Sequence, residues 1–352
     1  MKNKNTENLF ERIKKSKKIL YLDLGFLGDT IHQIPALNCI RKALPDVELH
    51  VMVADHIKSI LDVTPWVDKV LGYPRFPKGP VWYKDIERVL NLRKEKYDVI
   101  INLNGSDRTS LLTWGIGAPI RLGRTKEKKA PLFWSFCFTD NVTVARSDSP
   151  IYRQAWECLK KFGFPGEKPE FNIRIPEDVL QRVDKLIDNE RDFIHISPFT
   201  TQDYREVSIT ILAEFINIIQ KNDNNLKIAL SCAPSQRECE RFDFLLNLLE
   251  KAPWRTFKGT ALPPLDLVGL LYRSKLHIGG NSGALHAAFM AGTSTLSWFH
   301  DHPKIYEWLP DGAGHCAVIG ETTPQGLTGI TPNDLLNGYQ EVVRKKSLKY
   351  TA

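Results

Sequence analysis

Apolar residues follow two alternating patterns along the chain. Short apolar runs, typical of buried strands, are separated by segments in which apolar residues recur every three or four positions, as in amphipathic helices. In the first half, this pattern predicts strands at 18–24, 47–53, 67–71 and 98–103, and helices at 28–44, 55–61, 84–96 and 151–164. Strands that alternate with helices indicate a mostly parallel sheet covered by helices on both faces.

The second half repeats the alternation after an interruption. The segment 124–150 has no regular period and is expected to be a long loop, and the glycines and prolines of 163–169 favour a linker. Strands are then predicted at 193–197, 227–231, 255–257, 276–279 and 294–298, and helices at 208–220, 236–249, 265–272 and 284–290. Thr331 as a cap and Pro332 in the first turn predict a C-terminal helix.

The length of 352 residues exceeds what one hydrophobic core usually supports, so two domains are expected. We predict two Rossmann-like, doubly wound α/β domains at 1–169 and 170–330, followed by a helix and tail at 331–352. In open α/β sheets, ligands bind outside the carboxyl ends of the strands. Chemistry is therefore expected at those ends, in a cleft between the two domains.

Composition narrows the class of protein. No apolar run reaches the roughly 18 residues of a membrane-spanning helix, and the polar start lacks a signal segment, so we expect a cytoplasmic protein. The six cysteines are scattered without a CxxC pair, which argues against a disulfide framework or a structural metal site. A formal charge of +7 favours an anionic partner of unspecified kind.

Three polar turns follow predicted strands. The first, Gly25–His32, places Asp29 at a helix start, where it either acts on a ligand or merely caps the helix. Its spacing departs from GxGxxG, so it does not favour a dinucleotide. The second, 279–286, offers backbone N–H groups at a helix start that suit a diphosphate, although such turns also serve packing and His286 could be a core histidine.

The third turn, 197–206, carries Thr200, Thr201 and Arg205. Hydroxyl groups and a guanidinium at a strand end can hold phosphate oxygens. The alternative is a solvated loop in which Glu206 begins a helix.

Together these turns resemble the ADP-heptose:lipopolysaccharide heptosyltransferases of glycosyltransferase family 9. The resemblance rests on Gly28-Asp29 with His32-Gln-Ile-Pro-Ala-Leu37, on Thr200-Thr201 with a basic residue four positions on, and on Gly280-Asn-Ser-Gly-Ala-Leu-His286-Ala-Ala with Gly292. It spans about residues 18 to 345. It implies a GT-B fold, an inverting and metal-independent transfer without a cofactor, an amino-terminal acceptor domain and a carboxyl-terminal domain for the nucleotide-sugar.

The resemblance also assigns roles to single residues. Asp29 matches the general base, and Arg205 with Thr200 and Thr201 matches the loop that holds the diphosphate. The other implied donor contacts are Gln236 and Glu238 near the ribose, and Asn281, Ser282, Gly283 and His286 at the helix start. Two positions depart from the family pattern, which usually has Asp at 281 and Lys at 205, and both departures leave the donor sugar open.

A basic and aromatic stretch is a candidate surface for an anionic glycolipid acceptor, lipid A with its inner core. A plain solvated loop explains the same charges. The residues of this stretch are Arg121, Arg124, Lys126, Lys128, Lys129, Phe133, Trp134 and Phe136. Gly28, His32, Tyr152 and Arg153 are further candidate acceptor contacts.

The leading hypothesis is transfer of heptose from ADP-heptose to the lipopolysaccharide inner core, by an enzyme peripheral to the cytoplasmic face of the inner membrane. One alternative is the same chemistry with another nucleotide-sugar or another acceptor, either a glycan or a protein. Another is a non-catalytic module that binds sugar nucleotides. Nucleic acid is not an expected partner, because the basic residues lack a nucleic-acid-binding motif.

Overall fold

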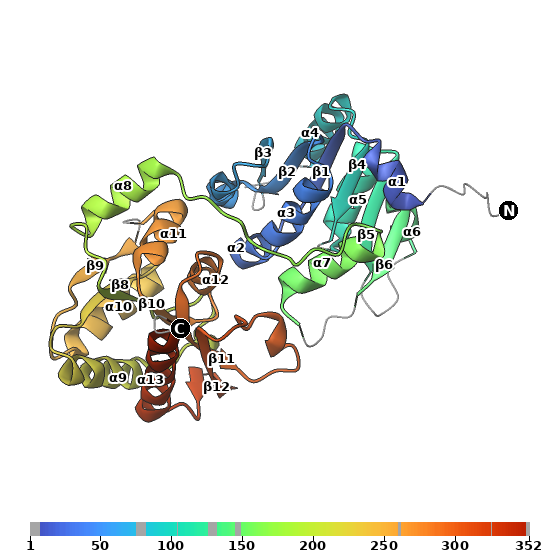
Figure 1. Cartoon of the computed structure of the whole chain (residues 1–352). Helices are drawn as coiled ribbons and strands as arrows, with labels where there is room; N and C mark the ends of the chain where they lie inside the picture. The colour runs from blue at the N-terminus through green and yellow to red at the C-terminus, as the bar shows by residue number, and fades with distance from the viewer. Residues whose placement is uncertain are drawn as a thin grey trace. The chain divides into compact units, whose positions relative to one another are not determined.

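The computed structural model describes residues 8–74, 82–103, 105–125, 132–144, 149–259, 262–324 and 326–349. The chain divides into two compact units, Met1–Arg174 and Ile175–Ala352, which we call the amino-terminal and the carboxyl-terminal unit (Figure 1). Each unit has its own sheet, of six and of seven strands, as the α/β prediction requires. The linker-like residues 163–169 lie within the amino-terminal unit.

The sheet of the amino-terminal unit is entirely parallel, in the order β3-β2-β1-β4-β5-β6. Its strands are β1 (Lys18–Leu22), β2 (Glu48–Ala54), β3 (Lys69–Tyr73), β4 (Val99–Asn102), β5 (Ile120–Thr125) and β6 (Asp140–Thr143). Its helices are α1 (Leu9–Lys14), α2 (Leu27–Ile31), α3 (Ile34–Ala43), η1 (Asp55–Val63, a 3₁₀ helix), α4 (Trp82–Lys94), α5 (Asp107–Ile116), α6 (Trp134–Cys137) and α7 (Ile151–Lys161). Helix α3 packs against α7, and α4 packs against α5.

Two predictions for this unit are wrong in detail. The helix expected at 28–44 is two helices, α2 and α3, because Pro35 in the first turn of α3 has no N–H to continue the hydrogen-bond ladder of α2. The expected loop 124–150 includes the end of β5, the short helix α6 and the edge strand β6. Elements of four residues are too short to show a helical or strand period in the sequence.

The carboxyl-terminal unit has the strand order β13-β12-β11-β10-β7-β8-β9, parallel except for the antiparallel pair β12 and β13. The strands are β7 (Phe193–Ser197), β8 (Lys227–Ser231), β9 (Arg255–Phe257), β10 (Leu276–Gly280), β11 (Ser294–His300), β12 (His315–Thr323) and β13 (Gly326–Thr328). The helices are α8 (Glu177–Leu186), η2 (Asp203–Arg205), α9 (Ile209–Asn222), α10 (Gln236–Leu248), α11 (Pro264–Arg273), α12 (Gly283–Met290), η4 (Ile305–Glu307) and α13 (Pro332–Lys349).

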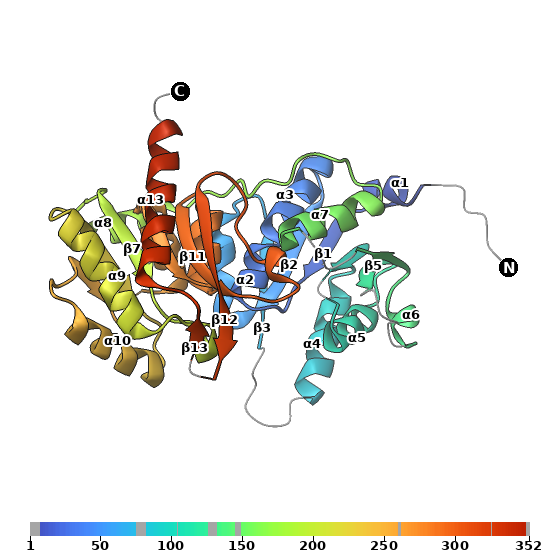
Figure 2. The same ribbon diagram turned by 90° about the horizontal axis from the view of Figure 1, so that it is seen from below.

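Helices cover both faces of this second sheet. Helix α9 packs against α10 and α13 (Figure 2). Helix α11 packs against α8 and α12. The main core lies under α9 and α13 and includes the fully buried Trp298, Phe215 and Leu335. Helix α8 and the strands β12 and β13 have no counterpart among the predicted elements, whereas the predicted C-terminal helix is present as α13.

Strand order determines where each sheet can bind a ligand. In the amino-terminal unit the chain moves from β1 toward β3 and later from β4 toward β6, so the direction reverses between β1 and β4. In the carboxyl-terminal unit the reversal lies between β7 and β10. The crevice beside such a reversal, at the carboxyl ends of the strands, is the usual ligand site of open α/β sheets. No helix among the described residues is long and apolar enough to span a membrane.

Candidate functional site

Asp29 lies at the carboxyl end of β1, beside the reversal of the first sheet. Its Oδ2 accepts a hydrogen bond of 2.8 Å from the backbone N–H of Phe26, so the side chain caps α2 while remaining half-buried. The turn leaves no room for a side chain at Gly25, where an added Cβ would lie 2.3 Å from the Cβ of Asp29. The carboxylate is therefore held in place by backbone within one turn of the chain.

A second carboxylate supports this turn. Asp23 is 1% exposed, its Oδ2 accepts a hydrogen bond of 2.8 Å from Thr30 Oγ1, and its Oδ1 accepts one of 3.2 Å from the backbone N–H of Gly25. Sequence reasoning missed Asp23, although an aspartate within an apolar strand end is a signal for a buried polar network. Asp23 keeps the β1–α2 connection rigid beneath Asp29.

The structure brings together three predicted acceptor contacts. The His32 ring, at the C-terminal end of α2, stacks on Tyr152 of α7 with centroids 6.2 Å apart and planes 19° apart. Arg153 is exposed and donates from Nε to the Tyr152 hydroxyl at 3.0 Å. Both rings are buried, whereas Arg153 carries a cation at the surface next to them.

The predicted basic surface is partly structural. Arg124 is 6% exposed and its Nη2 donates to Gln154 Oε1 at 2.6 Å and to the Val144 carbonyl at 3.0 Å. Arg121 donates to three backbone carbonyls, those of Ala118, Phe136 and Cys137. Lys126, Lys128 and Lys129 lie outside the described residues. Of the aromatic group, Trp134 is buried, Phe133 is half-buried and Phe136 is 68% exposed.

The loop after β7 is anchored by a buried acid. Glu206 is 1% exposed; its Oε1 accepts from the Thr200 N–H at 2.7 Å and from Arg237 Nη2 at 2.9 Å, and its Oε2 lies 3.1 Å from Arg241 Nη2. Arg237 also donates to the Thr200 carbonyl. Instead of beginning a helix, Glu206 ties the loop to two arginines of α10, which sequence reasoning missed.

The anchored loop presents the predicted diphosphate residues. The Thr200 hydroxyl donates to the Gln202 carbonyl at 2.7 Å and is buried, whereas Thr201 is exposed. Arg205 is half-buried, with its guanidinium 5.3 Å from the Tyr204 ring centroid and its Nε donating to the Tyr204 hydroxyl at 3.2 Å. Tyr204 thus orients the guanidinium that is predicted to contact the diphosphate.

Helix α12 begins at the carboxyl end of β10. Its cap residue Ser282 makes no capping hydrogen bond, and its Oγ is buried without a partner among the described residues. His286 is 3% exposed, its Nε2 lies 3.1 Å from Asn281 Oδ1, and burial lowers its pKa to about 4. The ring is therefore neutral near pH 7 and donates to Asn281, while the first N–H groups of α12 lack intrahelical acceptors.

The two residues predicted near the ribose are at the start of α10. Gln236 is exposed and donates to Glu240 Oε1 at 2.7 Å. Glu238 is buried, accepts from the Ala233 N–H at 2.9 Å, and forms a cap with Ser235. Burial raises the pKa of Glu238. These contacts place both residues at the carboxyl end of β8, one strand from the reversal.

The loops after β7 and β10 are neighbours at the reversal of the second sheet. A Cβ added to Gly280 would lie 3.0 Å from Thr200 Cγ2 and 2.6 Å from Trp298 Nε1, so only glycine fits there. Thr200, Asn281 and His286 are therefore brought to one place within the carboxyl-terminal unit. Their roles, like that of Asp29, stay predictions.

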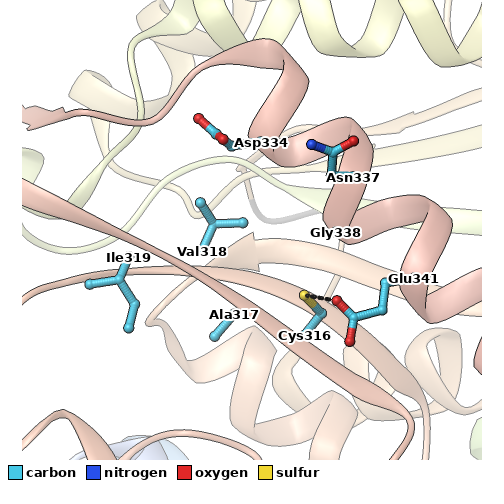
Figure 3. Close-up of a pocket in the computed structure, with 8 residues that line it drawn as sticks. All are labelled: Cys316, Ala317, Val318, Ile319, Asp334, Asn337, Gly338 and Glu341. Carbon is cyan, nitrogen blue, oxygen red and sulfur yellow. Dashed lines mark hydrogen bonds between the residues drawn. The ribbon is translucent and has the colours of Figure 1, made fainter.

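One hollow in this unit is lined by none of the predicted residues. It measures about 400 Å³ and lies between β12 and α13 at the edge of the sheet, where Cys316 Sγ donates to Glu341 Oε2 at 3.5 Å (Figure 3). Burial raises the pKa of Cys316 to about 11, so its thiol is protonated at neutral pH. Among the described residues, no three His, Cys, Asp or Glu side chains gather to hold a metal ion.

Comparisons with known proteins agree with this arrangement. The model of glycosyltransferase family 9 (heptosyltransferase) matches residues 89–309. The lipopolysaccharide core heptosyltransferase OpsX of Haemophilus influenzae is 23% identical over 290 residues, covering 82% of this chain and 80% of that protein.

Solved structures share the fold. A glycosyl transferase of family 9 from Veillonella parvula has a TM-score of 0.80 at 18% identity, covering 93% of this chain and 97% of its own. The E. coli heptosyltransferase WaaC with ADP has a TM-score of 0.71 at 16% identity, covering 93% and 98%. Because the family model spans more than half of the chain, the protein belongs to glycosyltransferase family 9 and is a glycosyltransferase with the GT-B fold.

Proposed function

We propose that the protein transfers heptose from ADP-heptose to the inner core of lipopolysaccharide, with inversion and without a metal ion. The observation that carries this proposal is the match to the heptosyltransferase family over residues 89–309. Two features support it: a half-buried carboxylate beside the reversal of one sheet, and a helix start without a side-chain cap beside the reversal of the other.

Asp29 is the proposed general base. The acceptor hydroxyl attacks the anomeric carbon, its proton passes to the Asp29 carboxylate, and the bond from that carbon to the diphosphate breaks with its electron pair going to the phosphate oxygen. A positioned carboxylate can take such a proton. A single displacement from the face opposite the leaving group inverts the anomeric centre.

The leaving diphosphate gains negative charge during this step. Arg205, the Thr200 and Thr201 turn and the first N–H groups of α12 are the proposed stabilising groups. Their positions are preset by protein contacts, in particular the Glu206 anchor of the Thr200 loop. Donors that are already oriented stabilise a developing anion without reorganising.

The acceptor is proposed to be an anionic glycolipid bound by the amino-terminal unit. Arg153 is an exposed cation beside Tyr152, and Phe136 is an exposed aromatic side chain on α6. A cation and an apolar ring at a surface suit a phosphorylated lipid at the cytoplasmic face of a membrane. Arg121 and Arg124 support this surface through their backbone and side-chain contacts.

Asn281 favours a second candidate function, the same reaction with another nucleotide-sugar. Its amide oxygen accepts the His286 N–H, and a neutral amide stands where the family resemblance leads one to expect a carboxylate. A neutral group beside the donor removes one repulsive charge from the diphosphate or sugar. A donor other than ADP-heptose is therefore an outcome that the test must be able to reveal.

The test is a transfer assay with purified full-length protein, ADP-heptose and a series of truncated lipopolysaccharide acceptors, in chelator. Asp29→Asn is the sharpest variant, since an amide oxygen can still accept the Phe26 N–H while the base is lost. We expect kcat to fall at least about 100-fold with ADP affinity unchanged. Asp62→Asn, at an exposed aspartate of the same unit, is the matched control.

Each outcome decides a separate part of the proposal. Turnover by Asp29→Asn close to that of the wild type would reject the general base. Wild-type protein that transfers no heptose to any acceptor in the series would reject the donor and acceptor pair, and the panel would then move to other nucleotide-sugars.

A further inference from the structure

Two histidines lie at the carboxyl end of β11, and the first of them contacts the loop that carries Arg205. His300 ends β11 and His302 comes two residues later; their rings are stacked with centroids 4.4 Å apart and planes 25° apart. The ring of Tyr204 packs edge-on against His300 at 5.9 Å. The Tyr204 hydroxyl also accepts a hydrogen bond from Arg205 Nε, so the stacked pair and Arg205 form one cluster at the carboxyl ends of the strands of the second sheet.

Both rings keep hydrogen-bonding capacity. His300 Nδ1 is buried and has no hydrogen-bond partner among the described residues. His302 Nδ1 accepts the backbone N–H of Lys304 at 3.1 Å, so the proton of its neutral ring is on Nε2. A buried ring nitrogen without a partner is costly unless water or a ligand satisfies it.

The charges around the pair keep it neutral in the free protein. Burial is the largest cause that lowers the pKa of both histidines. The neighbouring His302 is the next cause at His300, and the Arg205 cation lowers the pKa of both rings further. Asp301 acts in the opposite direction on both rings, Glu307 does so on His302, and Lys304 adds to the lowering at His302. Arg205 therefore faces a stacked pair that can accept a proton once its charge is compensated.

An anion bound to Arg205 would supply that compensation. A nucleoside diphosphate brings several negative charges to within a few ångströms of the stacked rings, which favours the imidazolium form. Helix α12 follows β10, the parallel neighbour of β11, so its first N–H groups lie at the same carboxyl ends of the strands. The site would thus gain a cation only when a phosphate is present.

We propose that His300 and His302 form a proton-accepting part of the diphosphate site, taking up a proton from solvent when the nucleotide binds beside Arg205. This inference rests on the proposed function, since it takes the Arg205 turn as the place of the diphosphate. It adds two anion-binding residues, the last residue of β11 and one in the loop that follows, to the turns after β7 and β10. It also makes the affinity for the nucleoside diphosphate greater at lower pH.

The experiment is isothermal titration calorimetry of the full chain with ADP, at pH 7.0, in two buffers of different ionisation enthalpy. The difference in heat gives the number of protons taken up. We expect the wild type to take up about half to one proton per ADP. Inorganic pyrophosphate, titrated in parallel, should show the same uptake, whereas adenosine should show none.

The variants are His300→Gln and His302→Asn, the second of which keeps an acceptor for the Lys304 N–H. Each should reduce proton uptake, and the double variant should abolish it and weaken ADP binding about 10-fold at pH 6.5 but much less at pH 8.5. His315→Asn is the matched control, because His315 begins β12 at the amino ends of the strands, away from the carboxyl ends where His300 lies. An amide at position 315 can still pair with Thr295 Oγ1.

The outcomes separate this inference from the proposed function. ADP binding by the wild type without proton uptake, or with uptake unchanged in the double variant, would overturn the histidine site and leave the proposed function standing. Pyrophosphate binding with proton uptake but no ADP binding would support the histidine site and overturn the nucleotide assignment. Binding of neither would overturn the histidine site. The single variants are compared with the wild type in the same way, so the histidine contribution to the proton count is measured even if the double variant does not fold.

Discussion

The turns at the two sheet reversals are built by different means. In the amino-terminal unit, Asp29 caps its own helix and Asp23 holds Gly25 and Thr30, so the contacts span at most seven residues. In the carboxyl-terminal unit, Glu206 holds its loop through Arg237, 31 residues later, and through Arg241. The first turn therefore depends on local chain geometry, whereas the second depends on long-range electrostatics.

The largest expected effect comes from breaking the long-range anchor with Glu206→Gln. The variant leaves Arg237 and Arg241 without their buried anion, and loss of one partner from a buried ion pair costs 3–5 kcal/mol in general. Because the two arginines are about one-third exposed, we expect about 2 kcal/mol here, together with weaker ADP binding. Thermal unfolding and calorimetry measure both effects.

Glu214→Gln is the control for this variant, since Glu214 is an exposed acid on α9 of the same unit. Its unfolding free energy should change by no more than about 0.5 kcal/mol. Equal stability of Glu206→Gln and Glu214→Gln would show that the loop is not held by the ion pair.

A pair of glycine substitutions sharpens the comparison with smaller effects. Gly25→Ala brings a methyl group against Asp29, and Gly280→Ala brings one against Trp298 and Thr200. Each should cost about 1–2 kcal/mol through overpacking. We expect Gly25→Ala to lower kcat with ADP affinity unchanged, and Gly280→Ala to weaken ADP binding.

Gly166→Ala is the reference for both, because an added Cβ there meets only Lys160 Cδ at 3.7 Å, an ordinary contact. The assays are turnover and ADP titration on the same preparations. If Gly25→Ala weakened ADP binding as much as Gly280→Ala did, the assignment of catalysis to the first turn and of donor binding to the second would be wrong.

Acid should weaken the carboxyl-terminal unit through its buried histidines. Burial lowers the pKa of His195 to about 3 and that of His286 to about 4, and it also lowers the pKa of His277. Below pH 6.5 the unfolded chain binds protons that the folded unit does not, so stability falls as the pH falls. From pH 7.5 to 5.5 each such group removes up to about 1.4 kcal/mol.

Asn281→Asp tests this account at one residue. A carboxylate in place of the amide that accepts the His286 N–H should raise the pKa of His286 and return up to about 1 kcal/mol at pH 5.5. Denaturant unfolding at pH 7.5 and 5.5, with an NMR titration of His286, measures both quantities. A steeper acid loss in the variant would contradict the neutral-histidine interpretation.

The features of the site that could be predicted were those formed by residues close together in the sequence. The turn that contains Asp29 and the turn from Asn281 to His286 could both be predicted from sequence. In each, an apolar strand, a glycine and a helix start are adjacent in the chain. Glu206 looked like an ordinary helix start, because its partners Arg237 and Arg241 are distant in sequence. Likewise Arg124 looked like a surface cation, yet Gln154 and Val144 enclose it.

The alternation of strands and helices, the glycine turns and the family motifs could all be read from the amino-acid sequence. Hydrophobic period and turn chemistry act over a few residues, so one chain segment suffices to show them. The contacts between polar side chains could be seen only in the folded chain. These contacts hold Asp23 to Thr30, Glu206 to two arginines, and His300 to His302. Strand order brings those residues together, and burial then sets their charge, which no single segment records.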